Sequence, residues 1–138
     1  MNGEGRPVVF IVEDNEPLQE AWQAVLEDAE VEVIAAYTIN EALMKFEANH
    51  PIIDVVVMDA ELATKPKMLQ INATLATKPN TLHLVEMMRW LGFTKPIIAA
   101  SGNSNWRGDQ LCAGCSHAAE KGVVVNKVLE LVPVLVIQ

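Results

Sequence analysis

The fold is decided by residues 52–62, which read IIDVVVMDAEL. Within them, Val55 to Met58 form an uninterrupted apolar run, rich in β-branched side chains, that ends at Asp59. A short run of this kind predicts a strand that is buried on both faces, as strands are in parallel sheets. Asp59 would then lie at the carboxyl edge of the sheet, where open α/β folds bind their ligands.

Other short apolar runs alternate with amphipathic helical patterns along the chain. This alternation is typical of βαβ units with right-handed crossovers, and it predicts a parallel sheet. The last strand has two candidate positions, because residues 117–120 are poor in β-forming residues whereas residues 123–125 are rich in them. The predicted strands are 8–12, 31–36, 53–58 and 97–100, with the fifth at 117–120 or 123–125.

A five-residue sequence occurs twice between the third and fourth predicted strands. Residues 62–66 read LATKP and so do residues 75–79, thirteen positions later. A unit this short is no solenoid repeat, which needs longer units and several copies. We therefore interpret the chain as one domain, residues 1–138, with an insertion at about residues 63–79.

The composition limits the partners and compartments of the 138-residue chain. Its formal net charge is −8 and its ten Lys and Arg residues are scattered, so no nucleic-acid partner is expected. The start MNGEGRP lacks the apolar core of a signal peptide, and no apolar run approaches the length of a membrane span. Two cysteines, Cys112 and Cys115, are too few for a disulfide framework. We expect a cytoplasmic protein, and the apolar end at 128–137 leaves a homodimer open.

Polar side chains follow three of the predicted strands. Glu13 and Asp14 come directly after the first strand, Asp59 after the third and Ser101 after the fourth. Three carboxylates at one sheet edge repel each other, so either one holds a proton or a hard cation lies among them. Mg²⁺ fits, because it prefers oxygen ligands and is often shared between carboxylates and a phosphoryl group. Such a site would let Asp59 attack phosphorus while the Ser101 hydroxyl and a lysine hold the phosphoryl oxygens.

Four stretches of the chain resemble the signature regions of response-regulator receiver domains: VVFIVEDN (8–15), DVVVMDAEL (54–62), PIIAASGN (96–103) and AGCSHAAEKG (113–122). The resemblance covers nearly the whole chain. It implies a flavodoxin-like (βα)₅ fold of the α/β class, a doubly wound parallel sheet with strand order 2-1-3-4-5, here with an insertion between strand 3 and helix 3. It also implies a signalling phosphoacceptor of a two-component system rather than an enzyme. A histidine kinase or phosphotransfer protein would phosphorylate Asp59 and so change the binding of a downstream protein.

The resemblance further implies a metal site. Glu13 and Asp14 match the acidic pair that binds Mg²⁺ in receivers, and Glu61 matches the residue whose backbone carbonyl completes the metal shell. With Asp59, these residues are the implied metal ligands. Removing the thirteen-residue repeat shortens the spacing between Asp59 and Ser101 from 42 to 29 positions, close to the spacing in the family.

The implied phosphoryl-binding groups are a hydroxyl and a lysine. Ser101 matches the switch Ser or Thr of receivers, and Lys121 matches the lysine that pairs with the phosphoryl group. Receivers carry Lys-Pro where this chain has Lys121-Gly122, and since a non-proline cis bond costs about 2.5–4 kcal/mol we expect a trans bond here. If the fifth strand is 123–125 instead, Lys127 becomes the active lysine.

Two other classes of function remain open. A pseudo-receiver would keep the fold as a binding module without phosphorylation, and two departures from the family favour it: Gly122, and Ala118 where receivers usually carry an aromatic switch residue. The intact acidic set opposes it. An aspartyl-phosphate hydrolase of the haloacid dehalogenase type is suggested by the D-x-E pattern of residues 59–61, but in that family the acidic pair follows the lysine, and here it precedes Asp59.

Overall fold

The computed structural model describes residues 1–62 and 79–133. The strands are β1 (Val8–Val12), β2 (Glu32–Ala36), β3 (Val55–Asp59), β4 (Ile97–Ala100) and β5 (His117–Ala119). The helices are α1 (Glu16–Asp28), α2 (Ile39–Asn49), α3 (Leu82–Trp90), α4 (Ser104–Ala113) and α5 (Val124–Leu131), with a 3₁₀ turn η3 (Lys121–Val123). The predicted insertion at 63–79 falls almost wholly outside the described residues, as does the end of the apolar tail.

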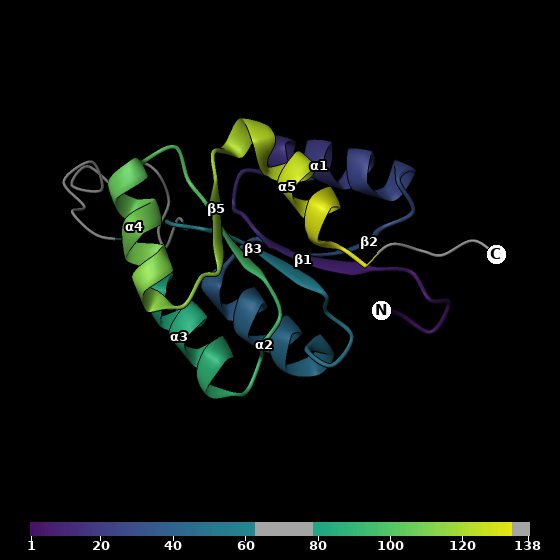
Figure 1. Ribbon diagram of the computed structural model, residues 1–138, viewed down its shortest axis with the longest axis horizontal. Helices are drawn as coiled ribbons and strands as arrows, with labels where there is room; N and C mark the ends of the chain where they lie inside the picture. Colours follow the sequence, from purple (N-terminus) through teal and green to yellow (C-terminus); the bar gives the residue numbers. More distant parts are fainter. Residues whose placement is uncertain (63–78, 134–138) are drawn as a thin grey trace.

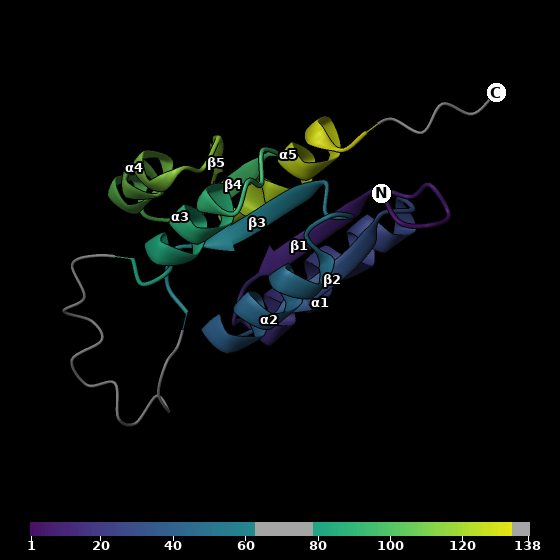
Figure 2. The ribbon, with the colours of Figure 1, turned by 90° about the horizontal axis from the view of Figure 1, so that it is seen from below.

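All strand pairings are parallel, and the sheet order is β2-β1-β3-β4-β5. The predicted flavodoxin-like (βα)₅ fold is therefore confirmed. Helices α1 and α5 cover one face of the sheet, and α2, α3 and α4 cover the other (Figure 1). Figure 2 shows that the arrowheads of β1 and β3 point the same way, so the residues that follow these strands meet at one edge.

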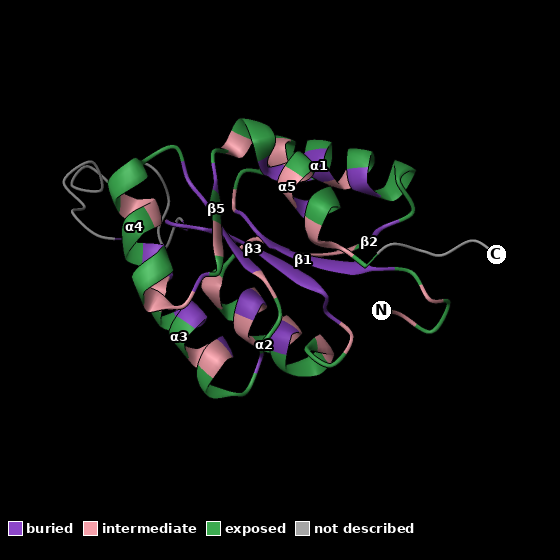
Figure 3. Cartoon of the chain, in the orientation of Figure 1, coloured by how far each residue is buried: buried purple, intermediate pink, exposed green. Residues whose placement is uncertain are grey.

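The central strands are buried on both faces because each face carries its own apolar core (Figure 3). Alternate residues of a strand point to opposite sides, so Phe10 of β1 packs in the core that contains Phe46. Its neighbour Ile11 packs in the other core, with Trp22 and Leu26 of α1. Two-sided burial is why these strands are continuous apolar runs rather than alternating ones.

The fifth strand is the one at 117–120, so the alternative at 123–125 is wrong. Val124 and Val128 are four residues apart and both buried on α5, so the period of an amphipathic helix outweighs the β-propensity of valine in this segment. The short β5 pairs with β4 through Ala99 and Ala118.

No helix within residues 1–62 and 79–133 has the length and apolar character needed to cross a membrane.

Candidate functional site

Three carboxylates gather at the carboxyl edge of β1 and β3. Asp59 is the last residue of β3, and Glu13 and Asp14 directly follow β1, the strand beside it. One carboxylate oxygen from each residue lies within 4.8 Å of the other two. Glu13 is 1% exposed and Asp59 5% exposed, while Asp14 is half-buried. The predicted gathering of these acids at one sheet edge is what the structure shows.

The environment of Asp59 opposes its charge. Burial, and after it the neighbouring Glu13 carboxylate, raises the pKa of Asp59 to about 8, although Lys121 acts in the opposite direction. Near neutral pH the cluster therefore either holds a proton or needs a further cation. All three side chains offer oxygen ligands, and this donor set and charge fit Mg²⁺.

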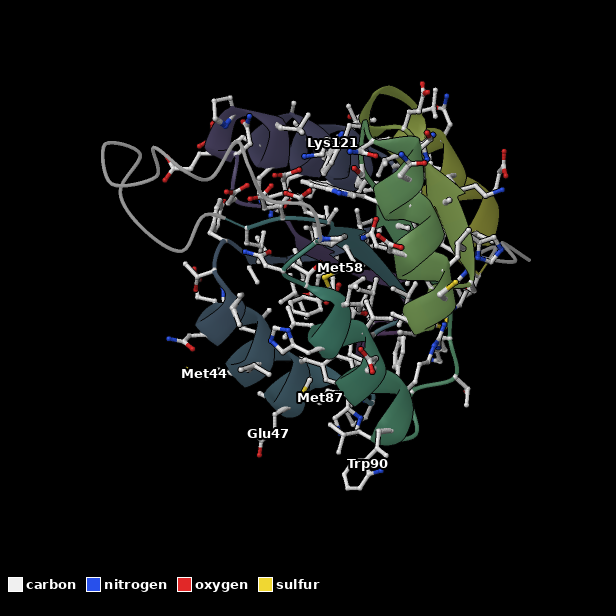
Figure 4. All side chains as sticks on the ribbon, turned by 90° about the vertical axis from the view of Figure 1, so that its left-hand side faces the viewer. Met44, Glu47, Met58, Met87, Trp90 and Lys121 are labelled. Carbon is white, nitrogen blue, oxygen red and sulfur yellow. The ribbon has the colours of Figure 1, made fainter. Side chains whose placement is uncertain are left out.

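Lys121 brings an ammonium group into this cluster. Its Nζ lies 2.7 Å from Glu13 Oε1 and 3.2 Å from Asp59 Oδ1, and Figure 4 labels the side chain. Burial disfavours the ammonium, but the two carboxylates outweigh it and raise the pKa of Lys121. Lys127 instead pairs with Glu130 on α5, at 3.3 Å. Of the two candidate lysines, the structure places Lys121 beside the acids.

The backbone at Lys121 agrees with the sequence prediction. The described residues contain no cis peptide bond, so Lys121 and Gly122 are joined in trans. Lys121 begins the turn η3, which is separated from β5 by Glu120 alone and leads into α5. A trans linkage thus still lets the ammonium reach the carboxylates.

Ser101 reaches the same edge from the neighbouring strand. It follows Ala100, the residue paired with Asp59 across β3 and β4, and it is buried. Its Oγ accepts a hydrogen bond from the Asn103 backbone N–H at 3.0 Å. Its carbonyl accepts one from Arg107 Nη1 at 2.6 Å. Ser101 is therefore held in place next to the acidic cluster.

Glu61 lies two residues after the end of β3 and is half-buried. Its carboxylate is not one of the three that gather. The role of Glu61 as a carbonyl ligand of the metal stays a prediction. Asp54, at the other end of β3, bonds the Val8 backbone N–H at 2.8 Å and Lys95 Nζ at 3.3 Å, and so serves the opposite edge of the sheet.

Two buried polar residues near the site were not predicted. Thr81 directly precedes α3, but its side chain makes no cap bond. Its hydroxyl donates instead to the carbonyl of Asp59 at 2.6 Å, with the Ala60 carbonyl at 3.0 Å. Gln19 of α1 is fully buried, and its Nε2 donates to the carbonyls of Ile11 at 3.1 Å and Glu13 at 3.3 Å. Both residues fix the backbone that carries the acids.

The ends of the inserted segment are held together beside the site. The Asn80 side chain accepts from the Leu62 backbone N–H at 2.8 Å and donates to the Leu62 carbonyl at 2.6 Å. The backbone N–H of Asn80 also donates to the Ala60 carbonyl at 3.1 Å. These three bonds join residues 18 or 20 positions apart in sequence, so the chain closes on itself just beyond Asp59.

Deleting residues 67–79 should leave the fold and the acidic site intact. The deletion joins Pro66 to Asn80 and keeps one LATKP copy, so the bonds between Leu62 and Asn80 can form again. A shorter connection costs no more closure entropy, and we expect an unfolding free energy equal to that of the parent or up to about 1 kcal/mol higher. Urea denaturation measures this difference. A loss of cooperative unfolding would show that the second copy is needed for the fold.

Solved structures with the same architecture are numerous. A two-component response regulator from Clostridium difficile superposes with a TM-score of 0.71 at 16% identity, covering 91% of this chain and 95% of that one. The response regulator TrrA of Thermotoga maritima, solved in complex with Mg²⁺-BeF, gives 0.70 at 20% identity, with 91% and 98% covered. This chain has the receiver-domain fold.

A third structure extends the comparison. A putative response regulator from Chloroflexus aurantiacus superposes with a TM-score of 0.68 at 22% identity, covering 91% of this chain and 97% of that one. No protein-family model and no curated protein matches the sequence. The receiver fold is thus carried by a sequence far from these structures, and the chemistry has to be argued from the residues at the sheet edge.

Proposed function

We propose that this chain is the phosphoacceptor receiver domain of a two-component system. In this proposal Asp59 accepts a phosphoryl group from a histidine kinase or phosphotransfer protein, with Mg²⁺ bound, and the domain then changes its binding to a downstream protein. The protein acts as a cytoplasmic signalling component rather than an enzyme. One observation carries the proposal: an ammonium group and two further carboxylates converge on Asp59 at the ligand-binding edge of a receiver fold.

The acceptor chemistry uses the ionised Asp59. One carboxylate oxygen attacks phosphorus, an O–P bond forms, and the P–N bond to the donor histidine breaks, so that the imidazole leaves with the electron pair and takes up a proton. Lys121 favours the ionised form of Asp59, because its ammonium lies 3.2 Å from Oδ1. The transferred group then lies beside Lys121, which can hold one of its oxygens.

Glu13, Asp14 and Asp59 would hold the Mg²⁺, with the Glu61 carbonyl as a further ligand. The ion would neutralise charge on the transferring phosphoryl group. Glu13 and Asp14 are positioned for this by the backbone bonds of Gln19 and by the Asn15 N–H, which donates to Glu13 Oε2 at 3.1 Å. The metal shell would therefore be built on the end of a buried strand rather than on a long loop.

Ser101 would bind a second phosphoryl oxygen. Its Oγ accepts from the Asn103 N–H, and within the described residues its hydroxyl hydrogen is donated to no carboxylate. That hydrogen can therefore be donated to a phosphoryl group on Asp59. Such a contact would draw the start of the loop between β4 and α4 toward the site, which provides a route from phosphorylation to the surface.

Incubation with acetyl phosphate tests the proposal. Intact mass spectrometry should detect the gain of one phosphoryl group in the presence of Mg²⁺, little gain with EDTA, and none in the Asp59→Asn variant. Acetyl phosphate replaces the unidentified kinase, so the test depends only on this chain. A protein that gains no phosphoryl group with Mg²⁺ present would be a pseudo-receiver, and the proposal would be wrong.

A further inference from the structure

Helix α4 is anchored to the sheet by a polar side chain. Gln110 is the buried residue of this helix, and it is 0% exposed. Its Nε2 donates a hydrogen bond to the main-chain carbonyl of Met58, 2.9 Å away and 52 positions earlier in the sequence. Met58, labelled in Figure 4, directly precedes Asp59 in β3. A side chain of α4 thus holds the backbone next to the proposed phosphoacceptor.

The beginning of α4 is attached to the second phosphoryl-binding residue. Arg107 Nη1 donates to the Ser101 carbonyl at 2.6 Å. Asn103, which caps α4, donates its backbone N–H to Ser101 Oγ at 3.0 Å. The helix is therefore bonded to the backbone at the ends of two neighbouring strands, β3 and β4.

The amide group of Gln110 makes only part of its possible hydrogen bonds. Its Oε1 is buried and lacks a hydrogen-bond partner. A buried acceptor without a donor is unfavourable, whereas an apolar side chain at this position would pack without that penalty. The observed position of α4 therefore carries a free-energy penalty, which a position that gave Oε1 a donor would remove. Such a penalty in one state makes a shift to another state less costly.

Strand β5, next to α4, has no Tyr or Phe that could transmit a signal from the site in place of Gln110. Ala118 of β5 is exposed and carries only a methyl group. Among the described residues, hydrogen bonds of the Ser101, Arg107 and Gln110 side chains connect the sheet edge to the start and the body of α4.

We propose that Gln110 is a positioning residue that couples the state of Asp59 to the position of α4. The inference rests on the proposed phosphoacceptor function. When Asp59 carries a phosphoryl group, the end of β3 and Ser101 shift, the bond from Gln110 to Met58 is altered, and α4 moves. The exposed side of α4, which includes Leu111, is then presented differently to a binding partner.

The experiment uses Mg²⁺ with beryllofluoride as the phosphoryl mimic and follows amide hydrogen exchange across residues 104–113. The main variant is Gln110→Met, which keeps the length of the side chain and removes its N–H donor. Gln110→Leu is the second apolar variant. Asp109→Asn changes the neighbouring exposed residue and is the matched control. Binding is measured in parallel, by titrating each protein with beryllofluoride.

We expect beryllofluoride to change the exchange rates of α4 amides in the wild type and in Asp109→Asn by about tenfold, and by less than about twofold in Gln110→Met. Affinity for the mimic should stay within about threefold in all of them, since Gln110 touches the backbone and not the ligand. A variant that binds beryllofluoride normally but shows no response in α4 has lost the coupling and not the binding.

Four outcomes would reject the inference. If α4 in both apolar variants responds as in the wild type, or if neither variant folds, Gln110 is a structural residue only. If the wild type binds beryllofluoride but α4 does not respond, the coupling is absent while the proposed function stands. If the wild type binds no beryllofluoride with Mg²⁺ present, the proposed function itself fails and the coupling fails with it.

Discussion

Replacing Asp59 by Asn should stabilise the metal-free protein at pH 8. The pKa of Asp59 is raised from 3.8 to about 8, first by burial and then by Glu13, so the folded protein holds this proton more tightly than the unfolded chain does. A raised carboxyl pKa makes folding stability fall as the pH rises between these two values. Asn is neutral throughout, so the gain in the variant should grow from pH 4 to pH 8.

The expected gain follows from the size of the pKa shift. One pKa unit corresponds to about 1.4 kcal/mol, and relaxation of the site and residual structure in the unfolded chain reduce the effect. We expect the variant to be more stable by about 2–4 kcal/mol at pH 8 in EDTA, and by little at pH 4. Urea denaturation at both pH values measures this. A variant less stable than the wild type at pH 8 would contradict the charge balance described for the site.

Mg²⁺ should reverse the order of the two proteins. An ion that binds only the folded state adds stability in proportion to the logarithm of its concentration above Kd. The wild type should gain stability on addition of Mg²⁺, whereas Asp59→Asn, which lacks one ligand and the excess charge, should gain much less.

Asp54→Asn is the matched control for this experiment, because Asp54 is a buried aspartate whose pKa is shifted in the opposite direction. Burial opposes its charge, but its bonds to the N-terminal ammonium, the Val8 N–H and Lys95 outweigh burial and lower its pKa. The stability contributed by Asp54 is present above the unfolded pKa and is lost as the pH falls. Its replacement should therefore destabilise the protein at pH 8 and leave the response to Mg²⁺ unchanged.

Replacing Lys121 by Ala should weaken binding of beryllofluoride with Mg²⁺ by about tenfold or more, because a charge-assisted hydrogen bond contributes about 1.5–3 kcal/mol. The same change removes the cation that lies between Glu13 and Asp59. We therefore also expect the pKa of Asp59 to rise further, and the metal-free protein to lose stability near pH 8. Titration with beryllofluoride, followed by NMR, measures the binding.

Lys127→Ala is the control for this change. Lys127 pairs with the exposed Glu130 on the same helix, and a surface pair of this kind contributes little to stability. We expect its affinity for beryllofluoride to stay within about twofold of the wild type. Equal losses in the two variants would contradict the assignment of Lys121 to the site.

Much of the fold could be predicted from the sequence because its signals are local. The run from Val55 to Met58 is a strand because two-sided burial demands an unbroken apolar segment, and the edge rule for parallel strands brought Glu13, Asp14 and Asp59 together. The position of the fifth strand could not be decided, since valine favours a strand by propensity and a helix by its spacing. Burial of Val124 against α1 decides it.

The supporting residues of the site could not be predicted, for a different reason. Thr81 looks locally like a helix cap, and Gln19 and Gln110 look like polar residues of helices. Their partners lie 6 to 52 positions away and are main-chain carbonyls, which leave no pattern in the sequence. Only the packing of the helices on the sheet shows that these side chains are buried and which carbonyls they reach.

The most direct test of the central claim is to locate the phosphoryl group. After phosphorylation with acetyl phosphate and Mg²⁺, borohydride reduces an acyl phosphate of aspartate to homoserine, and peptide mass mapping identifies the residue. We predict conversion at Asp59, dependent on Mg²⁺, with Asp14 and Asp54 unchanged. Conversion at another residue, or none in a protein that binds Mg²⁺, would contradict the assignment of Asp59 as the phosphoacceptor.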